Sequence, residues 1–263
     1  MNTSETKQIT GSLTLEDNYQ TTIYDDILTI SGANISLLDP AGEIFTDKGN
    51  DTVTVTDSTI TNNSETEAEL MFSMGSDNDS LTISNSTLNV NTFMGSGDDE
   101  VTIAGTPQSR VISNKKLSVG SGNDIVTLNA ILSGTGDMDF GADNDTLVFN
   151  GGELELEGSV SGLENLTVNS VGGKLEKDLS LVGENTTITL NGSLTGTDAR
   201  IISITDSNTT LNTGNNIRQN VAFDIDNSTF IQSTGGILEI YDTDTAFTAN
   251  NSTVKLHDFI AAG

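Results

Sequence analysis

The sequence predicts an all-β fold: one continuous, single-stranded parallel β-helix, or β-solenoid, of about a dozen turns over residues 1–263. Two observations predict it. An aspartate placed before a short strand recurs every 20 to 28 residues, and the strands alternate apolar and polar side chains. This spacing fits one turn of a solenoid, in which each turn of chain stacks on the previous one. We expect the helix to be right-handed.

The first repeat is a glycine- and aspartate-rich loop followed by a strand, as in "MGSGDDEVTI" (94–103) and "VGSGNDIVTL" (119–128). Its successive steps are 25, 28, 20, 25 and 21 residues. They are too long for hairpins with two-residue turns and too short for most βαβ units. Residues 20–150 are therefore predicted to form the turns that carry Gly-Asp loops. The six aligned aspartates are Asp26, Asp51, Asp79, Asp99, Asp124 and Asp145.

A second repeat continues after the Gly-Asp loops end near residue 150. A small polar residue opens a turn, and β-branched or apolar residues follow it. From residue 185 the steps are 23, 19 and 24 residues. We expect these segments to share one place in each turn, with stacked Asn side chains hydrogen-bonded as ladders. Residues 151–263 are predicted to form turns with such Asn-Ser/Thr corners. The copies begin at residues 57, 85, 185, 208, 227 and 251.

The strands are short, such as Val53-Thr54-Val55 and Leu81-Thr82-Ile83. Period-2 alternation directs one face inward and the threonines outward. Stacking then joins the few apolar side chains of each turn into one column, so a hydrophobic content of 34% suffices. Neighbouring strands lie about 4.8 Å apart, which predicts a rod of roughly 55 Å. "NNSETEAELMFSM" (62–74) is the one segment where we expect a loop insertion or a short helix.

The charge balance excludes several partners. The chain has 38 acidic and 10 basic residues, a net charge of −28. Nucleic acid and anionic membranes need a basic surface, so neither is an expected partner. There is no cysteine and no apolar run long enough to span a bilayer, so no direct membrane insertion is expected. The start lacks the layout of a signal peptide, and together with the abrupt end this favours a fragment of a longer protein.

The pattern G-x-G-N-D-x-V-T at 120–127 closely resembles the nonapeptide of calcium-binding RTX repeats. The resemblance implies Ca²⁺ bound between loops of adjacent turns by backbone carbonyls and aspartates. Paired carboxylates such as Asp98 and Asp99 become acceptable around a divalent cation. The tandem partner of the RTX repeat is missing here. The expected ligand-bearing residues are Asp51, Asp77, Asp79, Asp98, Asp99, Gly120, Gly122, Asn123, Asp124, Asp143 and Asp145.

A metal-free alternative remains open. Asp77 and Asp143 replace the second glycine of the motif, and Gly-Asn/Asp turns also close β-helix turns without any ion. Asn and Asp tolerate left-handed backbone conformations and bond their own backbone. An unchanged melting temperature with and without calcium would support this alternative.

Catalytic residues are not apparent. Glu153, Glu155 and Glu157 alternate along one strand, an arrangement that a solvated strand face explains. The single histidine, His257, has no assignable partners, and Lys115-Lys116 is the one basic pair. The chain has no Trp and three Tyr, so aromatic platforms for sugars are scarce. We expect no enzyme activity.

Most of the chain resembles the Cys-free, Asn/Thr-rich passenger or stalk regions of bacterial adhesins and autotransporters. The resemblance implies a non-enzymatic structural and adhesive module, extracellular or on the bacterial cell surface. Its partner would be a protein or glycan ligand on a host or neighbouring cell. The alternative is a β-helical polysaccharide-degrading enzyme or a phage tail protein.

Overall fold

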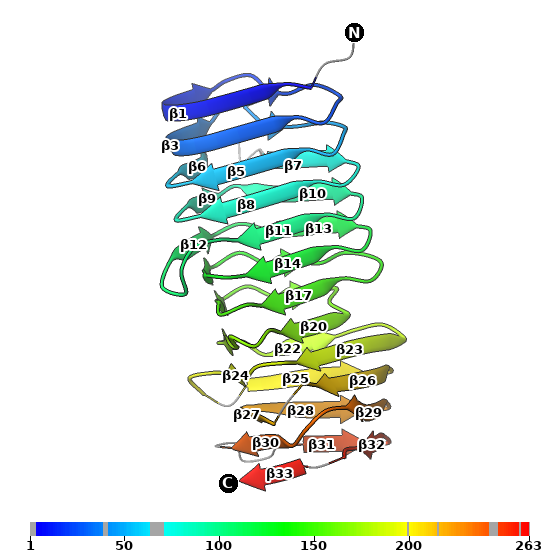
Figure 1. Cartoon of the computed structure of the whole chain (residues 1–263). Coiled ribbons are helices and arrows are strands. Elements are labelled where there is room, and N and C mark those ends of the chain that lie inside the picture. The colour runs from blue at the N-terminus through cyan, green and yellow to red at the C-terminus, as the bar shows by residue number, and fades with distance from the viewer. Residues whose placement is uncertain are drawn as a thin grey trace.

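The chain forms a parallel β-solenoid of about 11 turns, which confirms the predicted fold class. The computed structural model describes residues 4–38, 42–63, 71–198, 200–214, 216–241, 247–257 and 259–262. These residues form strands and turns and contain no helix, and therefore none that could cross a membrane. The turns stack from β1 (Thr6–Leu15) at one end to β33 (Phe259–Ala262) at the other (Figure 1).

Three strands make one turn, and corresponding strands stack into three faces. The first face begins with β1 and β3 (Ile27–Leu37), which continue around the corner into the second face. It goes on through β5 (Thr52–Thr56), β8 (Ser80–Ser84), β11 (Glu100–Ile103), β14 (Ile125–Leu128), β17 (Thr146–Phe149), β20 (Asn165–Val168), β23 (Asn185–Leu190), β26 (Asn208–Thr213), β29 (Thr229–Thr234) and β32 (Thr253–Lys255).

The other two faces are built in the same way. The second consists of β6 (Thr59–Asn62), β9 (Thr87–Asn89), β12 (Arg110–Ser113), β15 (Ile131–Gly134), β18 (Glu153–Leu156), β21 (Gly173–Leu175), β24 (Leu194–Thr195), β27 (Ile217–Gln219), β30 (Leu238–Tyr241) and β33. The third consists of β2 (Tyr19–Gln20), β4 (Ile44–Phe45), β7 (Met71–Ser76), β10 (Asn91–Ser96), β13 (Leu117–Ser121), β16 (Met138–Asp139), β19 (Val160–Ser161), β22 (Leu179–Leu181), β25 (Arg200–Thr205), β28 (Val221–Asp226) and β31 (Phe247–Asn250).

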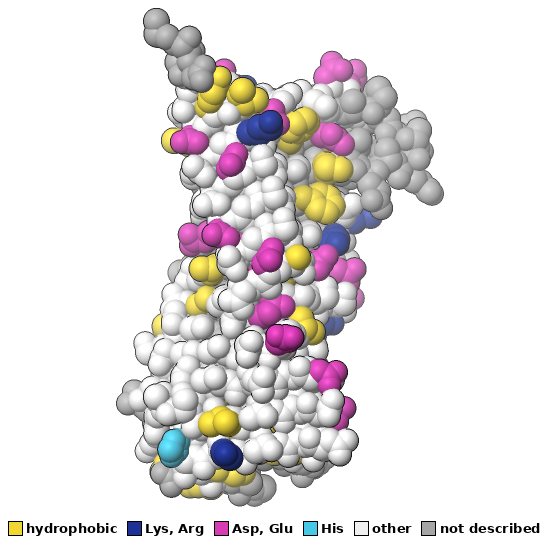
Figure 2. Space-filling view, turned by 90° about the vertical axis from the view of Figure 1, so that its right-hand side faces the viewer, with side chains coloured by type: hydrophobic (Ala, Val, Ile, Leu, Met, Phe, Trp, Pro, Cys, Tyr) yellow, Lys and Arg dark blue, Asp and Glu magenta, His cyan; other side chains and the backbone are white. Residues whose placement is uncertain are grey.

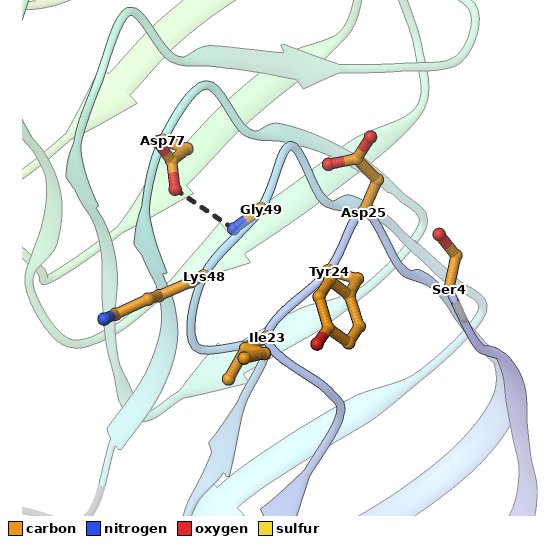
Figure 3. Close-up of a pocket in the computed structure, with 7 residues that line it drawn as sticks. All are labelled: Ser4, Ile23, Tyr24, Asp25, Lys48, Gly49 and Asp77. Atoms are coloured by element: carbon orange, nitrogen blue, oxygen red, sulfur yellow. Dashed lines mark hydrogen bonds between the residues drawn. The ribbon is translucent and has the colours of Figure 1, made fainter. Parts of the chain in front are cut away.

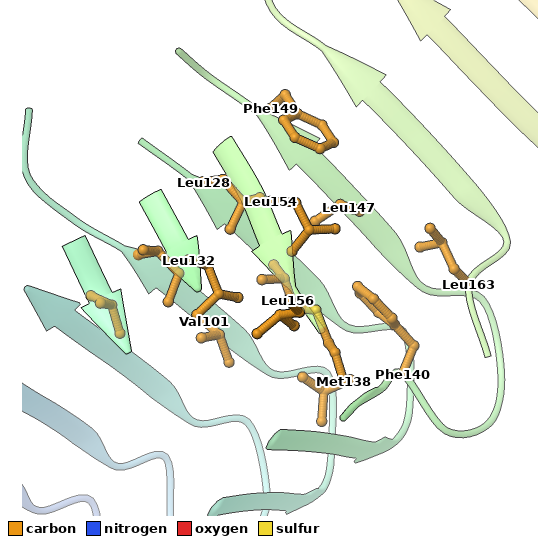
Figure 4. Close-up of a cluster of buried hydrophobic side chains, with 14 of the residues drawn as sticks. Val101, Leu128, Leu132, Met138, Phe140, Leu147, Phe149, Leu154, Leu156 and Leu163 are labelled. Carbon is orange, nitrogen blue, oxygen red and sulfur yellow. The ribbon is translucent and has the colours of Figure 1, made fainter. Parts of the chain in front are cut away.

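The core is the stacked column that the alternation predicts. Val53, Leu81, Val101, Val126 and Leu147 pair in register from turn to turn, and each is fully buried. The intervening threonines point outward and are partly exposed. Side chains from all three faces meet in the interior (Figure 4). Burial of apolar surface contributes about 25 cal/mol per Å², which makes this column the main source of stability.

The strands pair in the same register despite the unequal spacing of the repeats. Thr54 pairs with Thr82 across a step of 28 residues, and Thr82 pairs with Thr102 across a step of 20. Strand register is therefore independent of loop length. Part of the longest step, residues 64–70 of the expected insertion, lies outside the described residues. The described end of that segment, Met71–Met74, is in strand β7.

The Asn-Ser/Thr repeat does not occupy one place in each turn, so that prediction was wrong. Asp57 and Asn85 lie between the first and second faces, whereas Asn227 and Asn251 lie between the third and first faces. All four have φ between 47° and 50°. The copies at 185 and 208 begin strands β23 and β26.

The reason is that a local hydrogen bond sets the conformation of this two-residue corner. At each corner the next serine turns its hydroxyl back onto a carbonyl, as Ser86 does to Ser84 and Ser228 does to Asp226, both at 2.7 Å. The serine oxygen also accepts an amide N–H of the preceding turn, from Ser58 at Ser86 and from Ser207 at Ser228. Neither bond depends on which two faces the corner joins, so the corner occurs at either edge.

Candidate functional site

The Gly-Asp loops stack along one edge of the solenoid, where the chain passes from the third face to the first (Figure 1). We call it the loop edge. All eleven sequence-predicted residues lie on it. Asp51, Asp79, Asp99, Asp124 and Asp145 continue from Asp26 as one line, which we call the aspartate column. Beside it runs the outer column, which contains Asp98 and Asn123 and consists of Asp25, Asn50, Asn78, Asp98, Asn123 and Asn144.

The aspartate column is inside the rod rather than on its surface. Each of its side chains is at most 3% exposed. From Asp51 to Asp145, each Oδ1 accepts a hydrogen bond from the backbone N–H of the aspartate one turn earlier: Asp79 N to Asp99 Oδ1 is 2.7 Å, and Asp99 N to Asp124 Oδ1 is 2.8 Å. The carboxylates thus fasten consecutive turns at the point where each loop becomes a strand.

Their inward direction follows from the strand alternation. Asp99 precedes Val101 by two residues and Ile103 by four, so all three share one face of the chain. Sequence reasoning placed the aspartates on one edge but missed that the same period-2 rule turns them inward. That signal was present in the sequence.

The second carboxylate oxygens have no partner. Oδ2 of Asp51, Asp79, Asp99, Asp124 and Asp145 is buried without a hydrogen bond. Asp26, at the N-terminal end of the column, differs because its Oδ2 accepts the N–H of Thr22 at 2.6 Å and the Thr22 hydroxyl at 2.7 Å. An unpaired buried carboxylate oxygen is costly, so the column needs protons or cations.

Burial perturbs these groups strongly. Removal from water raises the pKa of Asp79 to about 8 and the pKa of Asp99 to about 7. It likewise raises the pKa of Asp145 to about 7 and that of Asp51 to about 6. Neighbouring carboxylates of the column add to the increase. At Asp26 burial also raises the pKa, but the hydrogen bonds from Thr22 and from the Glu5 N–H outweigh it, and its pKa is lowered.

The outer column forms an exposed ladder of hydrogen bonds. In it the N–H of each turn donates to the preceding turn, opposite to the direction in the aspartate column. Asp98 N donates to Asn78 Oδ1 and Asn123 N donates to Asp98 Oδ1, both at 2.8 Å. These bonds use only a side-chain oxygen as acceptor. Asn and Asp are therefore equally good acceptors at this position, which explains why the loops contain both.

Each loop from Asp47 to Asp145 has two positions with positive φ. Gly120 and Gly122 have φ of 112° and 123°, and a Cβ on them would lie 1.9 Å and 2.0 Å from carbonyl oxygens of the preceding turn. Asp77 and Asp143 stand at the second position with φ of 83° and 86°. Aspartate at this position also has a left-handed backbone conformation, with a smaller φ than the glycine it replaces.

Asp77 and Asp143 also tie adjacent loops together. Asp77 Oδ2 accepts the Gly49 N–H, and Asp143 Oδ2 accepts the Gly122 N–H, each at 3.2 Å. They do not converge on the aspartate column. Within the described ranges, no three His, Cys, Asp or Glu side chains gather as a metal-binding cluster.

The donor set nevertheless suits a hard cation. The five unpaired Oδ2 atoms are buried acceptors, and the glycine positions leave backbone carbonyls where a side chain would intrude. Calcium accepts carbonyl and carboxylate oxygens from several segments. A site here would therefore draw on two successive loops, with few carboxylates per ion.

The column changes chemistry toward the C-terminus. The Asp145 N–H is accepted by Glu164 Oε2 at 2.9 Å. In the following turns the same position is held by Thr186 and Thr209, whose hydroxyls lie 2.7 Å apart, and then by buried Phe230. Glu164 was missed by the sequence analysis, although "ENLTV" (164–168) aligns with "DTLVF" (145–149).

The residues considered for catalysis have structural partners. Glu155 pairs with Arg110 at 2.6 Å, and Glu153 pairs with Lys174 at 3.3 Å, on the outward side of β18. Lys116 pairs with Asp139 at 2.7 Å. His257 is exposed. No known family, curated protein or solved structure matches the chain.

Proposed function

We propose that the chain is a non-enzymatic structural and adhesive module of a bacterial surface or secreted protein. The observation that carries the proposal is the continuous parallel strand pairing across about 11 turns, which favours a stiff rod with lateral faces for contacts. The many uncompensated acidic residues would keep such a rod soluble and separate from anionic surfaces.

Adhesion is tested with beads coated with the whole chain and offered to cells of several types. The expected result is retention above beads coated with an unrelated acidic protein of equal charge. Retention equal to that control on every cell type would refute the adhesive role. Small-angle scattering of the free chain separately tests the rod shape.

We further propose that calcium neutralises the aspartate column. The unpaired Oδ2 atoms of Asp51, Asp79, Asp99, Asp124 and Asp145 support this, together with the carbonyls of the glycine positions. The outer-column and second-position residues Asp77, Asp98, Asn123 and Asp143 would order the loops. When bound, the ion would supply positive charge to buried carboxylates and cross-link adjacent turns.

The calcium proposal has a direct thermodynamic test. One site at a free ligand concentration one hundred times Kd contributes about 2.7 kcal/mol, so several sites should raise the melting temperature by more than 10 °C. Melting is followed by circular dichroism in calcium and in chelator, with magnesium as the comparison ion. An identical melt in calcium and in chelator would contradict the proposal.

A further inference from the structure

A hollow of about 330 Å³ opens on the loop edge near the N-terminal end. It is lined by Ile23, Tyr24, Asp25, Lys48, Gly49 and Asp77 (Figure 3). Farther along the edge the corresponding positions are mostly serine and glycine, as at Ser96-Gly97 and Ser121-Gly122. Here large side chains flank a glycine, and this difference in size creates the hollow.

The backbone around the hollow is fixed. Asn50 N donates to Asp25 Oδ1 at 2.9 Å, and Gly49 N donates to Asp77 Oδ2 at 3.2 Å. Each carboxylate therefore has one oxygen held by a loop and another left to accept a ligand's hydrogen bond. Gly49 has φ of 106°, and a Cβ there would lie 2.5 Å from the Tyr24 carbonyl carbon, so a side chain is excluded.

The remaining lining residues supply complementary groups. Lys48 has no ion pair with the described part of the chain, unlike Lys116, Lys174 and Arg110. Tyr24 is half-buried, and Ile23 is 53% exposed. Figure 3 shows Ile23 beside Tyr24 and Asp25 above Tyr24, while the Lys48 side chain extends on the other side of Ile23 with its amino group directed away from Tyr24. In Figure 2 hydrophobic and basic side chains occur together near the N-terminal end of this side, while acidic ones are spread along it.

This combination matches the chemistry of a sugar ring. An aromatic and an aliphatic side chain cover the C–H face of a pyranose, carboxylates accept hydrogen bonds from its hydroxyls, and an ammonium donates to its oxygens. The acidic surroundings disfavour a negatively charged sugar, and the hydroxyls of an uncharged sugar can donate to Asp25 and Asp77. A neutral hexose satisfies all three groups.

We propose that this hollow binds a neutral hexose of a cell-surface glycan. The inference rests on the proposed adhesive function, because the glycan would be the ligand that the rod contacts. A shallow site with few hydrogen bonds implies millimolar affinity for a single sugar unit. Tighter binding would then come from several rods acting together.

The test is a titration of the whole chain with methyl galactoside, methyl glucoside and methyl mannoside, followed by amide shifts of Tyr24, Asp25 and Gly49 in the NMR spectrum. At least one hexoside should shift these amides with saturation. Tyr24→Ala and Lys48→Ala should weaken binding at least tenfold. Lys115→Ala, which removes another exposed lysine, is the matched control and should bind as the parent does. Circular dichroism melts confirm that each variant is folded.

The inference is overturned if no hexoside shifts these amides, if Tyr24→Ala binds unchanged, or if only methyl glucuronide or glucosamine binds. Beads carrying a neutral oligosaccharide, competed with the free hexoside, distinguish a surface glycan from a soluble sugar. Cell adhesion that persists in Tyr24→Ala would refute the role of this site in adhesion while leaving the adhesive function supported. Hexoside binding without cell adhesion would support the site and refute the adhesive function.

Discussion

Replacing Asp99 by asparagine should stabilise the metal-free chain, although it removes a residue from the centre of the repeat. Asparagine keeps the Oδ1 that accepts the Asp79 N–H, so it resembles the protonated carboxyl in shape and bonding. The substitution therefore isolates the free energy of holding a negative charge at this buried position.

The magnitude follows from the pKa. The Asp99 carboxyl has a pKa of about 7 in the folded chain and an ordinary value of 3.8. Each pH unit between the two corresponds to about 1.4 kcal/mol. The folded chain holds the proton more tightly than the unfolded chain, so protonation of Asp99 stabilises the folded state. This contribution is complete below pH 3.8 and is lost as the pH rises to 7. Asp99→Asn should be more stable than the parent by about 2 kcal/mol at pH 5.5 and about 4 kcal/mol at pH 8.5.

Urea unfolding in chelator at these two pH values, followed by circular dichroism, measures the effect. Asp98→Asn is the matched control, since that exposed side chain keeps its Oδ1 acceptor, and its stability should change by less than about 0.5 kcal/mol at both pH values. An Asp99→Asn variant no more stable than the parent at pH 8.5 would refute the reasoning. In excess calcium the sign should reverse, because the variant then lacks a ligand.

Four further substitutions, one of them a control, test the architecture by urea unfolding. Gly120→Ala should lower the free energy of unfolding by more than 3 kcal/mol, since its Cβ would lie 1.9 Å from the Gly95 oxygen. The control Gly32→Ala, with φ of 58° and no atom within 4 Å, should lower it by about 1 kcal/mol. Equal losses would contradict the stacking argument. Leu147→Ala should cost about 2–5 kcal/mol because the side chain is fully buried, and a loss under 1 kcal/mol would indicate a loosely packed column. Ser86→Ala should cost about 1–3 kcal/mol, because its oxygen accepts an amide of the preceding turn and its hydroxyl donates to Ser84; an unchanged midpoint would show that these bonds contribute nothing.

The fold was predictable because its two signals are local and repeated. The alternation of Leu81-Thr82-Ile83 defines an inward face, and the recurring Asp79, Asp99 and Asp124 define the turn. Register survives because loops absorb the differences in spacing. The corner motif was harder to place, since Asn85 and Asn227 use the same local bonds at different edges of the turn.

The candidate site was predictable in position and not in bonding. That Asp99 lies on the loop edge follows from alignment. That its Oδ1 accepts the backbone N–H of the previous turn, while its Oδ2 has no partner, depends on the pairing of loops distant in sequence. The hollow at Tyr24 also needs the stack, because it arises between side chains of three different turns.

Because the described strands of each turn pair only with strands of the turns directly before and after it, the length of a corner is a nearly free variable. The segment Gly105–Ser109 already bulges out between β11 and β12 without disturbing the pairing of either strand. A foreign peptide inserted after Pro107 should therefore be carried on the side of an intact rod. The same tolerance gives natural variants a way to acquire new lateral appendages while their interior stays unaltered.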